Sequence, residues 1–204
     1  MEIITDLKSE PDLKHVHSRM GFKGKTDGIP ENMQKLVDEM ILCGQEICTP
    51  KAVYDYKPAE LIPPNIIELE GSFSINSSKA FNWMEGCSGL YLAAVTIGPG
   101  LDREVARLSE SDDMTRAFLL NAYGAEAAEA TMAELNKRII GFAREQGLST
   151  TKRYSPGYGD WHISAQSELL GSLQVEQIGI QLTDSYLMIP EKSVSAIIGA
   201  KPIA

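Results

Sequence analysis

The chain has 204 residues, 43% of them apolar and 23% charged, and a formal net charge of −9. A chain of this size and composition can bury enough apolar surface to fold without disulfides or a structural metal. Its 28 acidic residues outnumber its 19 lysines and arginines, and the basic residues form no cluster, which argues against nucleic acid as a partner.

The first residues, the apolar runs and the cysteines of the sequence bear on where the protein is expected in the cell. The first residues, MEIITDLKSEPDLK, are charged from the second position, and no apolar run approaches the length of about 18 residues that a membrane span needs. We therefore expect a soluble, cytoplasmic protein with no membrane contact. Cys43, Cys48 and Cys87 are odd in number and form no CxxC pair, so we expect reduced thiols, mostly buried.

The first half of the chain alternates between polar, helical and extended patterns. Residues 1–28 are polar and are interrupted by three glycines. From Pro30 to Ile47, apolar residues recur at three- and four-residue spacing, which predicts an amphipathic helix that Pro50 ends. Residues 54–71 are expected to be extended because prolines interrupt any helix there. A short helix is predicted over 78–85, and the apolar run GLYLAAVTIG (89–98) is typical of a strand buried on both faces.

The second half is dominated by one long helical pattern. Residues 112–146 contain no proline and carry an apolar stripe, which predicts a long central helix. Its middle, 121–130, is rich in small residues that allow another backbone or a ligand to come close. A shorter helix with Ile163 to Leu173 follows, and the runs IGIQL, SYLMI and SVSAIIG predict a C-terminal antiparallel meander. Without repeats or linkers, residues 1–204 are predicted to be one α+β domain.

Most residues that carry chemistry elsewhere lack partners in this sequence. IGPGLDREV (97–105) resembles a dinucleotide-binding turn, but Arg103 occupies the third glycine position, so we interpret it as a plain strand-to-helix turn. His15 and His17 lie two residues apart but have no third metal ligand nearby, and His162 is distant in the sequence. We expect all three histidines on the surface. Cys87 has no evident base and is expected to be buried. We therefore predict no catalytic residue and no metal site.

The segment 151–161, TKRYSPGYGDW, is the strongest candidate for a binding site. Arg153 offers a guanidinium to a ligand carboxylate, Ser155 and Gly157 offer backbone groups, and Tyr158 offers an aromatic face to an adenine ring. The alternative is a tight turn whose aromatic residues fill the core.

Arg-x-x-Pro-Gly-Tyr within this segment resembles the S-adenosylmethionine-binding signature of the activation domain of cobalamin-dependent methionine synthase. RYSPGYGDW with Gln166, followed by IGIQLTDSYLMIPEKSVSAIIG, is still more similar to the free-standing activation proteins of anaerobic bacteria. GFKGK (21–25), EGCSGLYLAAVTIG (85–98) and the Ala/Glu-rich long helix extend the resemblance over nearly the whole chain. It implies a twisted antiparallel sheet with a long central helix and flanking helices.

The resemblance also implies a ligand site. Arg153 would pair with the carboxylate of S-adenosylmethionine, and Ser155, Gly157 and Tyr158 would contact its amino group and adenine. Glu129 matches the family glutamate on the long helix, with a solvated helix charge as the alternative. Aromatic residues are expected to be exposed beside the loop, where they would cover a corrin; the candidates are Tyr154, Tyr158 and Trp161.

The chain lacks the Asp-x-His-x-x-Gly pattern that ligates cobalt, so cobalamin is expected to be carried by the partner. The resemblance implies an accessory subunit of a methionine synthase that lacks its own activation domain, with flavodoxin or ferredoxin as the electron donor. One alternative is an autonomous S-adenosylmethionine-dependent methyltransferase that acts on a small molecule. Another is a docking scaffold without a ligand site, because Ile197 and Ile198 stand where the synthase domain has an aromatic residue.

Overall fold

An antiparallel sheet forms the middle of the structure, a computed structural model that describes residues 1–22 and 29–203. Among these residues the strand order is β4-β3-β2-β5-β9-β6, and β1 pairs with β2 beside this path. The bounds of the sheet strands are β1 Glu2–Ile4, β2 Lys51–Ile62, β3 Ile66–Leu69, β4 Ser74–Asn76, β5 Gly89–Thr96, β6 Leu148–Thr150 and β9 Ser193–Pro202. Two further strands, β7 (Gln181–Leu182) and β8 (Met188–Ile189), form a separate hairpin.

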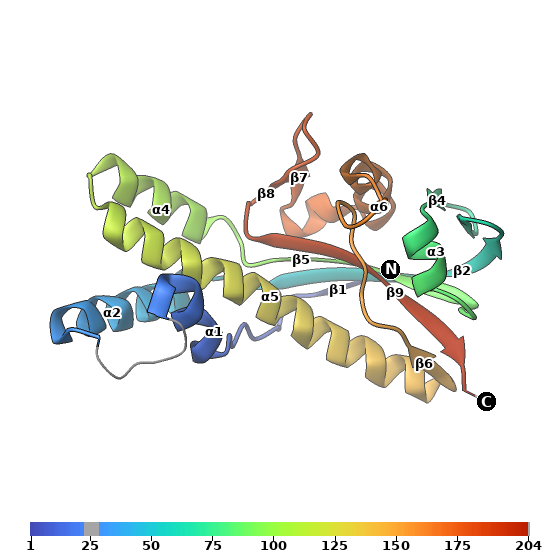
Figure 1. Cartoon of the computed structure of the whole chain (residues 1–204), viewed down its shortest axis with the longest axis horizontal. Helices are drawn as coiled ribbons and strands as arrows, with labels where there is room; N and C mark the ends of the chain where they lie inside the picture. Colours follow the sequence, from blue (N-terminus) through green and yellow to red (C-terminus); the bar gives the residue numbers. More distant parts are fainter. Residues whose placement is uncertain (23–28, 204) are drawn as a thin grey trace.

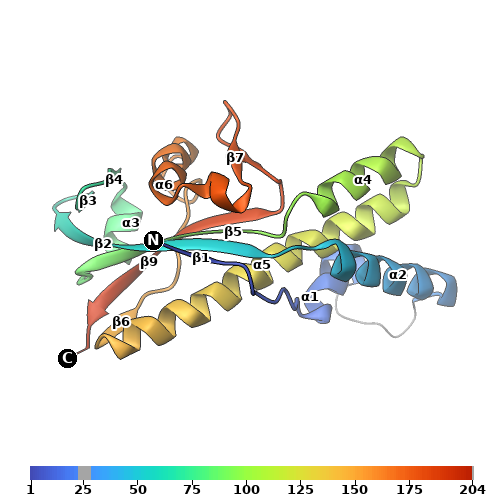
Figure 2. The same ribbon diagram turned by 180° about the vertical axis from the view of Figure 1, so that it is seen from behind.

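Helices cover both faces of this sheet (Figures 1 and 2). The long helix α5 runs along one face, while α6 and the β7–β8 hairpin lie on the other. The helices are α1 Leu13–His17, a π-helical turn Ser18–Phe22, α2 Glu31–Ile47, α3 Ser78–Trp83, α4 Gly100–Glu110, α5 Met114–Glu145 and α6 Gln166–Leu173, with 3-10 turns at Ile163–Ala165 and Val175–Ile178. The predicted α+β class, long central helix and flanking helices are confirmed.

Strand β5 is buried over its whole length, as its apolar sequence predicts. Alternate residues point to opposite faces of a strand. Leu90, Leu92 and Ala94 belong to the core that packs against α6, whereas the residues between them, Tyr91, Ala93 and Val95, pack against α5. This central strand therefore joins the two layers into one packed unit.

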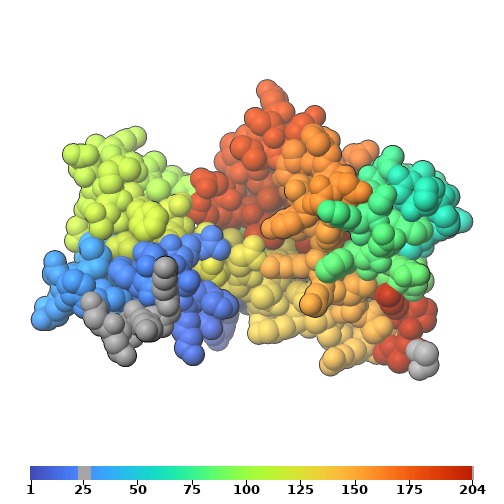
Figure 3. Space-filling model, viewed as in Figure 1, coloured from blue at the N-terminus to red at the C-terminus, as the bar shows by residue number. Residues whose placement is uncertain are grey.

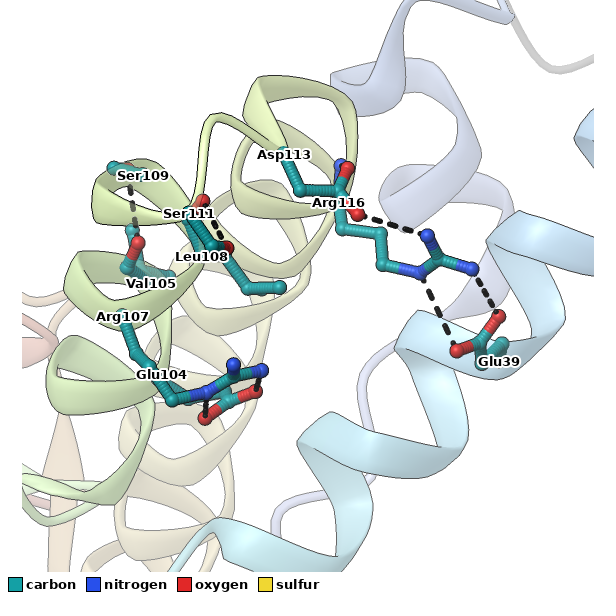
Figure 4. A network of polar contacts seen from close by, with 9 residues as sticks. All are labelled: Glu39, Glu104, Val105, Arg107, Leu108, Ser109, Ser111, Asp113 and Arg116. Carbon is teal, nitrogen blue, oxygen red and sulfur yellow. Dashed lines mark hydrogen bonds and ion pairs between the residues drawn. The ribbon is translucent and has the colours of Figure 1, made fainter.

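Beyond the end of the sheet, α2, α4 and the first half of α5 form a helical end (Figure 1). Arg116 links α5 to α2 by pairing with Glu39 at 3.0 Å, and it also pairs with Asp113 at 2.8 Å (Figure 4). Gly44 of α2 lies directly against the ring of Tyr123, where an added Cβ would fall 2.2 Å from a ring carbon. Close packing and one ion-pair network thus fix α2 on α5.

The predicted C-terminal meander is wrong. Runs IGIQL and SYLMI do pair with each other as β7 and β8, but the third run lies in the central sheet as β9. Strand β9 pairs with β5 on one side, for example Ile197 with Leu92, and with β6 on the other. The reason is burial: residues 195–200 are all buried, so the run is too apolar for an exposed edge.

Two smaller features differ from the prediction or extend it. Residues 2–4 form strand β1 within the polar first segment, where no strand is predicted. At 97–100 the chain makes the expected strand-to-helix turn into α4: Gly98 has φ +79°, and a Cβ on it would meet Oγ1 of Thr49 at 2.1 Å. Gly24, Gly28 and residues 23–25 of the GFKGK string lie outside the described residues.

The histidines and cysteines fill structural positions. His15 and His162 are exposed as expected, but His17 is buried, so the expectation of surface histidines is wrong there. Cys87 is buried, and this burial raises the pKa of its thiol, which disfavours a nucleophilic role. Cys43 and Cys48 are only half-buried. In residues 1–22 and 29–203, no group of three or more His, Cys, Asp or Glu is arranged to hold a metal ion.

None of the described helices combines the length and the apolar character needed to cross a membrane.

Candidate functional site

The loop 153–161, which we call the signature loop, is built on the edge of the central sheet. Tyr154 forms an antiparallel bridge with Ile197 of β9: its N–H donates to the Ile197 carbonyl at 2.9 Å, and its carbonyl accepts from Ile197 N–H at 2.8 Å. The Tyr154 ring stacks on Trp161, with centroids 6.1 Å apart and planes 7° from parallel. Trp161 is 3% exposed, so the two ends of the loop meet on the core.

Internal hydrogen bonds shape the tip of the signature loop. Gly157 N–H donates to the Trp161 carbonyl at 2.8 Å, and the Tyr154 hydroxyl donates to the Tyr158 carbonyl at 3.0 Å. Gly157 and Gly159 have φ values of +90° and +61°, which favour glycine. The loop itself therefore uses the N–H of Gly157.

A chain of hydrogen bonds ties the signature loop to distant elements. The Ser155 hydroxyl donates to the Ser195 carbonyl at 2.7 Å, and the Ser195 hydroxyl donates to Oε1 of Gln166 at 2.7 Å. Nε2 of Gln166 donates to the Tyr186 carbonyl at 2.8 Å, in the turn between β7 and β8. Gln166 is buried, so both ends of its amide are satisfied inside the protein. The loop is thus fixed to β9, α6 and the hairpin together.

Arg153 points away from this anchored base and toward α5. Its Nη2 pairs with Oε2 of Glu129, which lies on one side of the long helix. The other terminal nitrogen, Nη1, is buried and has no hydrogen-bond partner among the described residues. Both side chains line a cavity of about 730 Å³. A guanidinium with one unpaired terminal nitrogen is therefore held at a cavity large enough for a small molecule.

Helix α5 and the N-terminal segment form the two long walls of this cavity. The α5 wall consists of Glu126, Glu129, Ala130, Ala133, Glu134, Lys137 and Arg138. The opposite wall, which we call the N-terminal strap, is the segment 5–12 between β1 and α1. Arg138 pairs with Asp6 of the strap at 3.0 Å, and the Ser9 hydroxyl donates to the Ala127 carbonyl at 2.7 Å. Figure 3 shows the yellow surface of α5 between the blue N-terminal residues and the orange segment that follows α5.

The small residues of α5 explain why the strap can lie so near. Alanines at 127, 130 and 133 put no long side chain between the helix and the strap, as the small-residue stretch predicts. The strap was not predicted as part of the site. It is polar and has no periodic pattern, so only its contacts with α5 reveal its place.

The structure brings together two of the five predicted site residues. Glu129 and Arg153 share the cavity, whereas Ser155, Gly157 and Tyr158 do not line it. Tyr158 is 66% exposed at the tip of the signature loop. The expectation that Trp161 is exposed is wrong, because its ring stacks on Tyr154 inside the core. Trp83 of α3, which was not predicted, is 46% exposed and lies 5.9 Å from the Tyr154 ring.

The fold is shared with a solved protein domain. The structure matches a solved structure described as "Crystal Structure of the MetH Reactivation Domain bound to AdoHcy", with a TM-score of 0.75. The match covers 100% of this chain and 79% of that chain at 17% sequence identity, so it establishes the fold.

A family model described as "Vitamin B12 dependent methionine synthase, activation domain" matches residues 85–204, which is more than half of the chain. The chain belongs to this family. The matched region contains β5, α5, the signature loop and β9, and the resemblance found in the sequence is confirmed. The chain therefore has a role in cobalamin reactivation and associates with the cobalamin-binding enzyme.

Proposed function

We propose that the cavity between α5 and the N-terminal strap binds S-adenosylmethionine, and that the protein presents it to cobalamin held by a separate methionine synthase. The observation that carries the proposal is the meeting of Arg153 and Glu129 at one cavity, with Nη1 of Arg153 unpaired. The amino-acid end of the ligand has one carboxylate and one ammonium group, which match this pair in charge. The reactivation domain of similar fold is bound to AdoHcy, which supports the same class of ligand.

In this proposal the ion pair exchanges partners when the ligand enters. Arg153 turns its fork to the ligand carboxylate, since a guanidinium binds a carboxylate through two N–H groups. Glu129 is then free to accept from the ligand ammonium group. Both side chains are about a third or more exposed, so the pair that they form with each other is weak enough to be replaced.

Ser155, Gly157 and Tyr158 remain proposed contacts for the rest of the ligand. They lie on the signature loop next to Arg153 but outside the cavity as it stands. Tyr158 is exposed, so its ring is free to pack on an adenine face. The hydrogen bond of Ser155 to β9 keeps the base of the loop in place.

The cobalamin is proposed to belong to the partner, a synthase without its own activation domain, with flavodoxin or ferredoxin as the source of electrons. When bound, S-adenosylmethionine would supply a sulfonium methyl group for transfer to cobalt. The protein contributes binding, orientation and exclusion of water. Exposed Tyr158 and Trp83 beside the signature loop offer an aromatic surface for a planar corrin. The protein acts in this proposal as an accessory subunit with no catalytic residue of its own.

Calorimetry tests the ligand. The protein should bind S-adenosylmethionine with one-to-one stoichiometry, and adenosine, which lacks both the carboxylate and the ammonium group, should bind much more weakly. If S-adenosylmethionine at millimolar concentration gives no heat of binding, the site is lost and the protein is a docking scaffold. Equal affinities for the two compounds would exclude the Arg153–Glu129 pair as the anchor.

A further inference from the structure

Asp160, the last polar residue of the signature loop, is bound to the start of helix α3. One of its carboxylate oxygens accepts from the Ser77 hydroxyl at 2.5 Å, and the other accepts from Ser78 N–H at 2.9 Å. The Lys79 N–H also donates to the first of these oxygens, at 3.2 Å. Three donors from three successive residues thus converge on one carboxylate, which comes from a segment about eighty positions further along the chain.

The other end of α3 holds the chain that leads into the signature loop. The indole N–H of Trp83 donates to the Lys152 carbonyl at 3.0 Å, one residue before Arg153. The start of helix α3 therefore contacts the signature loop, and the end of α3 contacts the residue that precedes this loop. Its own first turn is closed independently, because the Ser77 hydroxyl also accepts from Ala80 N–H at 2.9 Å. The contact with Asp160 is an addition to a helix that is already capped.

The other hydrogen bonds that shape the loop tip lie within the signature loop itself. Tyr154 is fixed by the bridge to Ile197, and Trp161 is fixed in the core. Between them, residues 157–159 are exposed and contain two glycines with positive φ. Side-chain hydrogen bonds of Asp160 join this end of the loop to α3. A Cβ on Gly159 would meet Cδ of Lys79 at 2.5 Å, so the tip also lies directly against α3.

We propose that Asp160 is a positioning residue that fixes the tip of the signature loop, and with it Tyr158, for ligand binding. The inference rests on the proposed binding of S-adenosylmethionine and adds a residue that acts through the loop and does not touch the ligand. The Ser77 hydroxyl and the N–H groups of Lys79 and Ser78 hold the pKa of the Asp160 carboxyl below its usual range. Asp160 is therefore ionised at neutral pH and accepts hydrogen bonds only.

The first test replaces Asp160 with asparagine, which keeps the shape but turns one acceptor into a donor that faces the donors of α3. A free loop tip must be ordered when the ligand binds, so the affinity for S-adenosylmethionine should fall about fivefold, the scale of a lost helix-capping contact. Asp113→Asn is the matched control. Asp113 also caps a helix, by accepting from Arg116 N–H at 3.2 Å, but it lies at the helical end away from the cavity.

Ser78→Pro tests the same contact from the other side. It removes the Ser78 N–H that Asp160 accepts, at the first position of a helix, where proline is well tolerated. The preceding Ser77 has φ −162° and ψ 121°, an extended conformation that a following proline allows. This variant should also weaken binding, and it decides the question if Asp160→Asn fails to fold.

A double-mutant cycle separates positioning from general stability. If Asp160 acts through Tyr158, the loss caused by Asp160→Asn should shrink in a Tyr158→Ala background. Unchanged affinity in both Asp160→Asn and Ser78→Pro would overturn the positioning role of Asp160 and would leave the proposed function in place. The same would follow if Asp113→Asn caused an equal loss of affinity. Failure of the wild-type protein to bind S-adenosylmethionine would overturn the proposed function and this inference with it.

Discussion

The guanidinium of Arg153 pairs with the carboxylate of Glu129, which lies 24 residues earlier in the chain, on the long helix α5. Neither side chain is deeply buried, at 35% and 44% exposed, so the pair contributes little to the stability of the fold. Both residues face the same cavity. An ion pair of this kind is easily exchanged for a ligand that offers the same two charges, which leads to the first two predictions.

Arg153→Ala should weaken the binding of S-adenosylmethionine by about 2 kcal/mol, or about 30-fold, because it removes a charge-assisted contact with the ligand carboxylate. Isothermal titration calorimetry measures the effect. Arg107→Ala is the matched control: Arg107 pairs with Glu104 at 2.7 Å on α4 and does not line the cavity. An equal loss in both variants would point to a general effect of charge and remove Arg153 from the site.

Glu129→Gln should reduce binding by about 1.5 kcal/mol, because a neutral amide replaces the charged acceptor for the ligand ammonium group. The thermal midpoint should stay close to that of the wild type, since Glu129 is nearly half exposed. Glu104→Gln, which breaks the pair with Arg107, should leave the affinity unchanged. Equal affinity of Glu129→Gln and the wild type would show that Glu129 is a solvated helix charge.

Local patterns in the sequence were sufficient for much of the fold. Helix α5 and strand β5 follow from a helical stripe and an unbroken apolar run, which depend only on neighbouring residues. The position of β9 does not follow from a local pattern. Its sequence is typical of a strand, but its pairing of Ile197 with Leu92 joins distant parts of the chain, and register of that kind is decided by tertiary packing.

The site was predictable only in part for the same reason. Arg153 could be identified from its place beside a Pro-Gly turn, while Glu129 was identified through the family resemblance. The N-terminal strap could not be identified, because its place depends on the contacts of Asp6 with Arg138 and of Ser9 with Ala127. Trp161 was wrongly expected to be exposed, since its burial depends on a stack with Tyr154 that the sheet edge sets up.

Two glycines in helices should respond to alanine with opposite signs. An added Cβ at Gly44 would lie 2.2 Å from a ring carbon of Tyr123, so Gly44→Ala should destabilise the protein by about 2 kcal/mol through overpacking. Gly141 of α5 is exposed, and nothing lies within 4 Å of its added Cβ. Gly141→Ala should therefore stabilise the protein by about 0.5–1 kcal/mol. Urea unfolding gives both free energies, and a Gly44→Ala variant that is as stable as the wild type, or more stable, would contradict the packing of α2 on α5.

The last prediction separates an accessory subunit from an autonomous methyltransferase. An accessory subunit holds its ligand over the cobalamin of another protein, so methyl transfer should require a methionine synthase without its own activation domain, together with a low-potential reductant. The experiment mixes the protein with that synthase in the cob(II)alamin state, adds reductant and labelled S-adenosylmethionine, and follows both the corrinoid absorbance and the label. The label should reach the corrinoid in the complete mixture and should stay on S-adenosylmethionine when the synthase or the reductant is left out. Arg153→Ala should slow the transfer at low ligand concentration, and Arg107→Ala should not, since Arg153 lines the cavity and Arg107 does not. Transfer of label to a small-molecule acceptor without any corrinoid protein would contradict the accessory role and favour the autonomous methyltransferase.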